Sequence, residues 1–384
     1  MTSSQAGAAL PSAVRDQFPG AKEGTYLNTA AESLFMDSHR DALARYADRK
    51  SLGAAGRKAL VTVEDHCREL VGQLLQVSPS DIAFLASTAR GLDVAIKSID
   101  WQVGDNIVVA DTEFPTTAFA AVHLSERGVE RRLVRSEDGA VPPTAFAEQI
   151  DDRTRLVVAS LVSYKNGFKI DLPELSQVAH AHGALLFIDA VQAAGAVEIA
   201  AGAADFLCAG TYKWLLGAHG LAAFYVNPSV AERIHPPYVG YRGVVDLFAA
   251  DRFERYTLLP DARRFEEGMP NYLGLHVLEN ALTVVLDIGV DTIAEHNARL
   301  VDQAMTGLLR LGIEPLTPKD PRARGAIVSF ETGREAEITD GLALAGIGVW
   351  GRDGRVRIAP HLYNTPEDVD MFLHHLQQLV GRAA

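Results

Sequence analysis

The sequence of 384 residues contains only two cysteines, Cys67 and Cys208. One lies in a charged helical pattern and the other in an apolar strand pattern, so they form neither a metal-binding motif nor a disulfide framework. We therefore expect no metal site and a reducing, cytoplasmic location. Cys208 is expected to be a small core residue and not a nucleophile.

Long apolar runs and an excess of positive charge are also lacking. No stretch approaches the roughly 18 apolar residues of a membrane-spanning helix. The first residues lack a positive start followed by an apolar core, so no signal peptide is expected. Acidic residues outnumber basic ones by 49 to 36, a formal net charge of −13. This charge argues against a nucleic acid or an anionic membrane as partner.

The sequence does contain short apolar runs that alternate with helical patterns between about residues 55 and 226. The apolar runs predict strands, several of them apolar on both faces, at 81–87, 106–111, 155–164, 184–190, 204–210 and 221–226. Apolar spacings of three and four predict helices at 89–99, 116–128 and 171–183. This alternation predicts an α/β domain whose mainly parallel sheet is covered by helices on both faces.

The pattern changes after about residue 250. Two long helical patterns, at 272–289 and 292–312, precede predicted strands at 324–331 and 354–360 and a closing helix at 365–380. This order predicts a smaller α+β C-terminal domain. We expect an N-terminal segment, 1–24, that packs on the small domain, a large domain at 25–250 and the small domain at 251–384.

Polar residues follow three of the predicted strands, at the edge where an open parallel sheet binds its ligands. Asp189 ends the apolar run of "LLFIDAVQAAG", and Gln192 lies in the turn that follows. Lys213 follows the next strand in "DFLCAGTYKWLLGAHG". Residues 87–90, in "FLASTARGLDVAI", lie at a strand-to-helix turn, where free N–H groups and the helix dipole favour a phosphate.

Each of these signals alone has an ordinary explanation, since aspartate often caps a strand end and Ser and Thr often begin helices. A lysine in an apolar run can also extend to the surface. Together the three groups match the needs of pyridoxal phosphate: a lysine for its Schiff base, a carboxylate on the pyridine nitrogen and a phosphate cradle. A lysine shielded from water loses its proton readily, so its amine can attack an aldehyde.

Seven motifs resemble those of the fold type I pyridoxal-phosphate enzymes, specifically the class V aminotransferase and cysteine desulfurase-like family, in its isopenicillin N epimerase-like and C–S lyase-like branch. They are "YLNTAAESL", "TEFPTTAFA", "VSYKNGFKIDL", "IDAVQAAG", "GTYKWLLGAHG", "RRFEEGMPN" and "VRIAPHLYNTPEDVD". The resemblance extends over almost the whole chain. It implies the fold type I transferase fold, pyridoxal 5′-phosphate as cofactor, and a homodimer with active sites at its interface.

The resemblance also implies roles for single residues. Lys213 would be the Schiff-base lysine and Asp189 the partner of the pyridinium nitrogen. Contacts with the cofactor would further come from Thr88, Ala89, Arg90, Phe114, Gln192, Thr211, Tyr212, Met269 and Asn271. The substrate would contact Asn28, Tyr164 and Arg357.

Several of these roles are specific. Thr88, Ala89 and Arg90 would hold the phosphate through backbone N–H groups, together with the Thr88 hydroxyl. Gln192 would hydrogen-bond the cofactor's phenolic oxygen, and Phe114 would stack on the pyridine ring. 

Arg357 matches the arginine that binds a substrate α-carboxylate in a bidentate manner, through two parallel hydrogen bonds. A surface charge on a strand is the alternative interpretation. The apolar neighbours Val356 and Ile358 point the other way along the strand, which favours the substrate role.

Four departures from the family pattern bear on the site and the reaction. Met269 stands where a threonine usually reaches the partner subunit's phosphate. Tyr164 stands where many relatives have asparagine, and Tyr212 where desulfurases usually have histidine. The fourth departure is segment 344–360, "LAGIGVWGRDGRVRIAP", which lacks the cysteine that accepts sulfur in desulfurases. A persulfide-forming desulfurase is therefore not expected.

Trp350, Arg352 and Arg355 occupy this segment instead. Arg352 is a candidate contact for a second acidic group on a substrate. Solvated loop charges are the favoured interpretation of both arginines.

Three reactions remain open: β-elimination, transamination with a keto acid, and epimerisation, for which Tyr164 is a candidate second acid. We rank first a carbon–sulfur β-lyase acting on a cysteine conjugate, because a desulfurase-like sequence without an acceptor cysteine suits that reaction. An aminotransferase or an amino-acid epimerase is the alternative. A non-catalytic binding protein is a remote alternative, against which the joint presence of Lys213, Asp189 and Arg357 argues.

Overall fold

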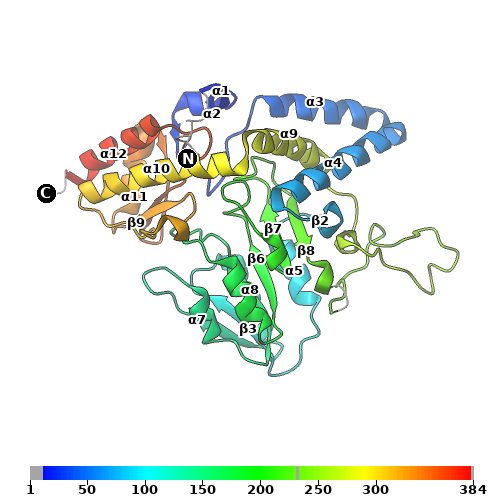
Figure 1. The fold of residues 1–384 in the computed structure, drawn as a ribbon. Helices are drawn as coiled ribbons and strands as arrows, with labels where there is room; N and C mark the ends of the chain where they lie inside the picture. The colour runs from blue at the N-terminus through cyan, green and yellow to red at the C-terminus, as the bar shows by residue number, and fades with distance from the viewer. Residues whose placement is uncertain (1–11, 231–232, 382–384) are drawn as a thin grey trace, which may run out of the picture.

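The computed structural model describes residues 12–230 and 233–381, and its centre is a seven-stranded sheet (Figure 1). The strands are β2 (Ile82–Leu85), β3 (Asn106–Ala110), β4 (Glu130–Val134), β5 (Thr154–Ser160), β6 (Leu185–Asp189), β7 (Phe206–Gly210) and β8 (Ala222–Val226). Their order is β2-β8-β7-β6-β5-β3-β4. Neighbouring strands are parallel except at β8, which is antiparallel to both β2 and β7. The predicted mainly parallel sheet is confirmed.

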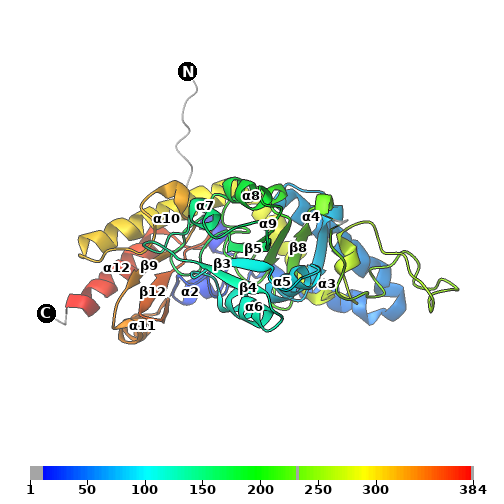
Figure 2. The ribbon, with the colours of Figure 1, turned by 90° about the horizontal axis from the view of Figure 1, so that it is seen from below.

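Helices cover both faces of this sheet (Figure 2). They are α4 (Arg57–Leu75), α5 (Thr88–Lys97), α6 (Pro115–Ser125), α7 (Pro143–Ala147), α8 (Leu172–His180) and α9 (Tyr272–Ile288). On one face α5 and α6 share a core with Val109 and Phe187, and on the other α4, α8 and α9 share a core with Val108 and Ile188. Successive strand residues thus enter opposite cores, which is why these strands are apolar on both faces.

A second core lies beside the first (Figure 1). It is built from α10 (Val290–Arg310), α11 (Glu335–Leu344), α12 (Pro366–Gly381) and an antiparallel sheet of β9 (Val328–Glu331), β11 (Trp350–Arg352) and β12 (Arg355–Ile358). The early chain joins this core, because β1 (Thr25–Tyr26) pairs with β10 (Ile347–Gly348). Two short helices, α1 (Ser12–Arg15) and α2 (Gly20–Glu23), precede β1, and Arg15 forms an ion pair with Asp368 of α12. Residues 1–11 of the predicted N-terminal segment lie outside the described residues.

The connection between the two cores is made by α9 and α10, which meet at an angle of 78° at Gly289. Gly289 has φ +91°, a conformation that favours glycine. α9 packs on α4 and on α3 (Ser38–Ser51), whereas most of α10 belongs to the second core. The domain boundary expected at 250/251 stays a prediction. In the described chain no single helix is long and apolar enough to cross a membrane, and α9 and α10 meet that test only as a bent pair.

Four charged side chains form a buried network between α4 and the segment before α9. Arg68 and Arg242 each pair with both Glu64 and Glu266, with Arg68 Nη2 2.7 Å from Glu266 Oε1 and Arg242 Nη2 3.0 Å from Glu266 Oε2. The N–H of Phe84 in β2 donates to Glu266 Oε1 at 3.0 Å. Burial raises the pKa of Glu64, and the two arginines oppose this shift. The network fixes the chain around residue 266 against the edge of the main sheet.

Replacing Arg68 by Met should lower the free energy of unfolding by about 3 kcal/mol, because two buried carboxylates would then share one arginine. The loss should be smaller at pH 5 than at pH 8, since the raised pKa of Glu64 lets protonation relieve the repulsion. Urea unfolding at both pH values measures this change. The control is Arg322→Met, which removes an exposed pair with Asp320 and should leave stability unaltered. Equal losses in the two variants would contradict the role of the network.

Candidate active site

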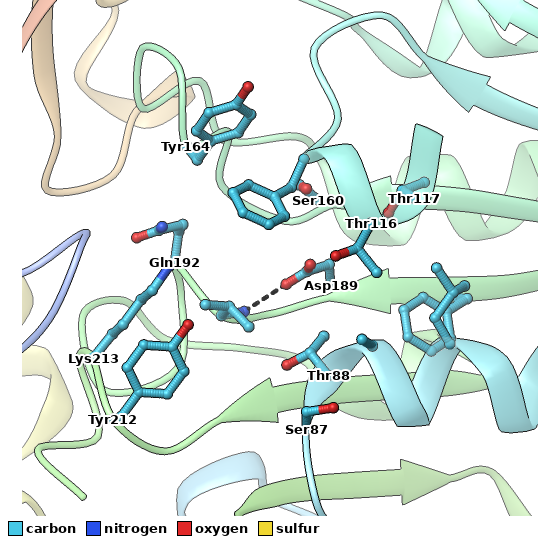
Figure 3. A pocket seen from close by; sticks show the side chains of 15 residues that line it. Ser87, Thr88, Thr116, Thr117, Ser160, Tyr164, Asp189, Gln192, Tyr212 and Lys213 are labelled. Carbon is cyan, nitrogen blue, oxygen red and sulfur yellow. Dashed lines mark hydrogen bonds between the residues drawn. The ribbon is translucent and has the colours of Figure 1, made fainter. Parts of the chain in front are cut away.

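A cavity lies at the carboxyl ends of β5, β6 and β7, on the face of the sheet that α5 and α6 cover (Figure 3). Eight of the residues predicted for the site line it: Thr88, Ala89, Phe114, Tyr164, Asp189, Gln192, Tyr212 and Lys213. They come from five segments that are far apart in the sequence. The parallel strands bring them together because their carboxyl ends share one edge.

Lys213 lies in the turn directly after β7 and is 8% exposed. Its Nζ lies 5.9 Å from the ring centroid of Phe114 and 5.5 Å from that of Tyr212. Burial lowers the pKa of Lys213 to about 8; Arg357 acts in the same direction and Asp189 opposes it. About a tenth of this amine is therefore neutral at pH 7, far more than for an exposed lysine, and the neutral form is the one that attacks an aldehyde.

Asp189 is the last residue of β6 and lines the same cavity. Its Oδ1 accepts a hydrogen bond of 2.9 Å from the N–H of Val191, the dashed line in Figure 3. Burial raises the pKa of Asp189, whereas the Val191 hydrogen bond and the charge of Lys213 lower it. A carboxylate in this environment favours a cationic partner, such as a protonated pyridine nitrogen.

The first turn of α5 contains the residues predicted to bind the phosphate. Ser87 caps the helix, and its Oγ accepts from the N–H of Arg90 at 3.1 Å. That N–H is thus already used, so the prediction of a phosphate contact there rests on the N–H groups of Thr88 and Ala89. In the described part of the protein, Thr88 Oγ1 is buried without a nitrogen or oxygen partner, and its polar neighbour is the weakly bonding thiol of Cys208. The Arg90 side chain pairs instead with Asp93 and Glu267.

Gln192 is held from two sides. Its Oε1 accepts from Trp214 Nε1 at 2.7 Å, and its Nε2 donates to the carbonyl of Ala30 at 3.0 Å. One N–H of the amide is left for a further acceptor, because a primary amide has two. The Trp214 carbonyl is in turn bonded to His361 Nε2 at 3.1 Å, and burial lowers the pKa of His361 to about 3.

Arg357 approaches the cavity from the second core. Its Nη1 donates to the carbonyl of Tyr164 at 2.9 Å, and its guanidinium lies 4.7 Å from the ring centroid of Trp350. Burial lowers the pKa of Arg357 to about 10, and the charge of Arg355 adds to this effect. Arg357 Nε and the Oδ1 of Asn28 are both buried without a hydrogen-bond partner among the residues described. The neighbours of Arg357 on β12 enter the second core, as the alternation along the strand predicted.

Six predicted residues are not part of the cavity lining: Asn28, Arg90, Thr211, Met269, Asn271 and Arg357. The Thr211 hydroxyl donates to the carbonyls of Ala218 and Leu221 at 2.6 and 3.1 Å. Met269 and Asn271 line a separate hollow, which they share with Arg90. Met269 is 44% exposed there, and Asn271 caps α9.

Sequence reasoning missed a hydrogen-bonded pair beside Asp189, formed by Glu113 and Ser160. Glu113 accepts hydrogen bonds from the N–H of Ser160 at 2.8 Å and from its Oγ at 2.7 Å. Ser160 lines the cavity and pairs with Asp189 across β5 and β6. Burial raises the pKa of Glu113 to about 7. The available signal was a polar residue at a strand end, but Ser160 falls inside the longer apolar run 155–164.

The sequence matches the family described as "Aminotransferase class-V" over residues 26–372. The chain belongs to this family. It is similar to an uncharacterized aminotransferase of Bacillus subtilis, with 26% identity over 94% of this chain and 95% of the relative. A probable cysteine desulfurase of Methanothermobacter thermautotrophicus is 26% identical over 82% of this chain and 83% of the relative.

Solved structures show the same fold. A cysteine desulfurase of Thermococcus onnurineus aligns with a TM-score of 0.89 and 24% identity over the whole of both chains. A cystine C–S lyase, solved with its product cysteine persulfide, aligns with a TM-score of 0.86 and 21% identity over 94% of this chain and 99% of the other. The predicted fold type I architecture is thereby confirmed.

This class-V aminotransferase family member is a pyridoxal-phosphate enzyme, and the residues of the cavity fit the cofactor. The unpartnered Thr88 hydroxyl and the start of α5 suit the phosphate, the Asp189 carboxylate suits the ring nitrogen, and the buried Lys213 amine suits the aldehyde. When bound, pyridoxal phosphate supplies an electron sink for chemistry at the Cα atom of an amino acid.

Replacing Lys213 by Met should stabilise the cofactor-free protein at pH 7. The fall of the lysine pKa from 10.5 to about 8 corresponds to about 3 kcal/mol, at about 1.4 kcal/mol per pH unit. Between these pKa values the unfolded chain keeps a proton that the folded protein has lost, so wild-type stability should rise with pH in this window. Urea unfolding should show a gain of up to about 3 kcal/mol at pH 7 that vanishes near pH 10.5. The exposed control Lys58→Met should show no such pH dependence, and an equal response of both variants would sink the idea.

Proposed function

We propose that this enzyme is a carbon–sulfur β-lyase acting on a cysteine conjugate. One observation carries the proposal: the segment 344–360, where desulfurases place their sulfur-accepting cysteine, contains none. Trp350 of β11 lies there instead, packed under the guanidinium of Arg357. The similarity in fold to a cystine C–S lyase supports this assignment. Sulfur would then leave as a free thiolate and not as an enzyme-bound persulfide.

The geometry supports a division of work between the two cores. Arg357, whose Nε is buried without a hydrogen-bond partner among the residues described, would bind the α-carboxylate. Asn28, whose unpartnered Oδ1 is an acceptor, would contact a donor group of the substrate. The neutral amine of Lys213 would remove the proton from Cα, after which the thiolate departs from Cβ. Asp189 would hold the pyridine nitrogen in its protonated form.

The remaining side chains of the cavity would position the cofactor. Thr88 and Ala89 would bind its phosphate through N–H groups and the Thr88 hydroxyl. Gln192 would donate its spare N–H to the phenolic oxygen, and Phe114 would stack on the ring. The hydrogen bond from Trp214 fixes the orientation of the Gln192 amide, so its donor faces away from Trp214.

Transamination and epimerisation are the alternatives. Tyr164 is the residue that bears on epimerisation, because it lines the cavity and its ring lies 5.2 Å from that of Phe114. An epimerase needs a second acid on the face of Cα opposite to Lys213. A keto acid as second substrate would identify an aminotransferase.

The enzyme with its cofactor should release pyruvate and ammonia from S-substituted cysteines, because elimination at Cβ yields an aminoacrylate that hydrolyses to these products. Coupled assays for pyruvate and ammonia measure this reaction. Asp189→Asn should bind cofactor but lose activity by several kcal/mol in activation free energy, since an amide cannot hold the ring proton. Amino-group exchange with a keto acid, or inversion at Cα without pyruvate, would identify one of the alternatives and refute the lyase.

We also propose that the enzyme is a homodimer. A long segment between β8 and α9 projects from the body of the protein (Figures 1 and 2). Its exposed apolar side chains include Tyr238, Val245, Phe248, Phe253 and Tyr256. Exposed apolar groups gathered on one segment favour an interface. The hollow of Met269 follows this segment, which suits contact with the partner's cofactor. A cytoplasmic location remains a prediction.

The double variant Phe248→Asp/Phe253→Asp should shift the protein from dimer to monomer, because charges would replace rings that are 80% and 88% exposed in the single chain. Sedimentation velocity of the enzyme measures the change. Leu344→Asp is the matched control, since Leu344 is 93% exposed but lies on α11 of the second core. A monomeric wild-type protein, or dissociation by the control variant alone, would refute this interface.

A further inference from the structure

The sequence interpretation of Arg355 as a solvated loop charge is wrong. Arg355 is 8% exposed, although Arg352 on the same hairpin is exposed as expected. Arg355 and Arg357 alternate with the core residue Val356 on β12, so both project from the other face of the strand. Trp350 lies beside both guanidinium groups. Its ring centroid is 6.0 Å from the Cζ atom of Arg355 and 4.7 Å from the Cζ atom of Arg357.

Arg355 is poorly compensated for a buried charge. Its ion pair is with Asp353 at 3.6 Å, and the Asp353 side chain is 63% exposed. In the part of the chain that the structure describes, Arg355 Nε is buried without a hydrogen-bond partner. Burying a cation with donors unused is costly, so a site of this kind favours an anion that the single chain does not provide.

A third cation, Lys165, interacts electrostatically with Arg355. Lys165 donates from Nζ to the carbonyl of Asp111 at 2.9 Å. Its pKa is lowered, first by burial and then by the charge of Arg355, whereas Asp111, Asp353 and Glu113 oppose the shift. Of these carboxylates, Glu113 is engaged by both hydrogen bonds from Ser160. The ion pair that Arg355 forms is therefore with Asp353, at the exposed end of the hairpin.

Lys165 and Arg355 are close in sequence to residues of the proposed substrate site. Lys165 follows Tyr164, whose carbonyl binds Arg357 and whose side chain lines the cavity. The proposed phosphate cradle lies elsewhere, at the start of α5 and on the cavity wall formed by Ser87 and Thr88 (Figure 3). The phosphate of the cofactor therefore does not account for the unused donor of Arg355.

We propose that Arg355, supported by Lys165, binds a second anionic group on the side chain of the substrate. The substrate class is then an amino acid with an acidic side chain, such as a cysteine whose sulfur bears a carboxylate. Arg357 would take the α-carboxylate and Arg355 the distal one, from neighbouring positions about 6.7 Å apart on the same strand face. This inference rests on the proposed function for the α-carboxylate role of Arg357.

Binding of inert ligands tests the subsite without any reaction. Glutarate and its monoamide differ only in one charged end, and so do adipate and its monoamide. Titration calorimetry of the enzyme with its cofactor identifies which of the two diacids binds more tightly. The dissociation constant of that diacid should be at least tenfold lower than that of its monoamide. Arg355→Gln should reduce this ratio to about one, because the neutral amide side chain cannot distinguish charge.

Arg352→Gln is the matched control, since it removes an exposed arginine from the same hairpin and should keep the wild-type ratio. Arg355→Lys should keep part of the ratio and guards against misfolding of the Gln variant, whose fold is checked by circular dichroism. A wild-type ratio near one, an unchanged ratio in Arg355→Gln, or loss of the ratio in Arg352→Gln would overturn the proposal.

A substrate pair separates this inference from the lyase proposal. S-Carboxymethyl-cysteine and S-carbamoylmethyl-cysteine are near-isosteric, and the first should have a kcat/KM at least tenfold higher. Preference for diacids without pyruvate from any cysteine conjugate would refute the lyase and keep the subsite. Pyruvate formed equally well from both compounds would keep the lyase and overturn the subsite.

Discussion

Burial of the Lys213 amine is the constraint on which the site depends. The strand β7 ends in an apolar region, and the turn after it places the amine near the rings of Phe114 and Tyr212. Desolvation disfavours the charged form there, whereas the Asp189 carboxylate limits the shift. The same low-polarity surroundings raise the pKa of Asp189. Burial therefore favours the neutral amine that pyridoxal chemistry requires, whereas the ionised form of Asp189 depends on the Val191 hydrogen bond and on a cationic partner.

The second core supplies the proposed carboxylate-binding residue, Arg357, to the site at the sheet edge. Arg357 is carried by β12, and its neighbours are fixed in that core, while its guanidinium is bonded to a carbonyl of the large sheet's loop. A substrate carboxylate would thus bind across the junction of the two cores. Asn28 also lies at this junction, where its backbone forms a parallel β-bridge with Ala359, the residue after β12. Because residues from both cores would contact the substrate, substrate binding would depend on the relative position of the two cores.

Local patterns predicted the fold and the residues at strand ends, because apolar runs and strand boundaries are properties of neighbouring residues. Asp189 and Lys213 were found in this way. The edge strand β4 was not, since its "ERRLV" sequence is exposed and charged and lacks an apolar run. The burial of Arg355 was also missed, because it depends on how the hairpin packs in three dimensions, with Trp350 beside the guanidinium. The use of the Arg90 N–H by Ser87 depends on the side-chain geometry of the helix cap.

The pairing of β1 with β10 has a consequence for the order in which parts of the protein can fold during synthesis. Thr25 bonds to Asp368 across 343 residues, and β1 obtains its strand partner only from residues 347–348. On the ribosome the first segment emerges long before its partners exist, so the second core cannot close until synthesis is nearly finished. Such distant contacts slow folding, because a long loop must close before they form. The arginine that would grip the substrate is thus among the last parts of the molecule to reach its place.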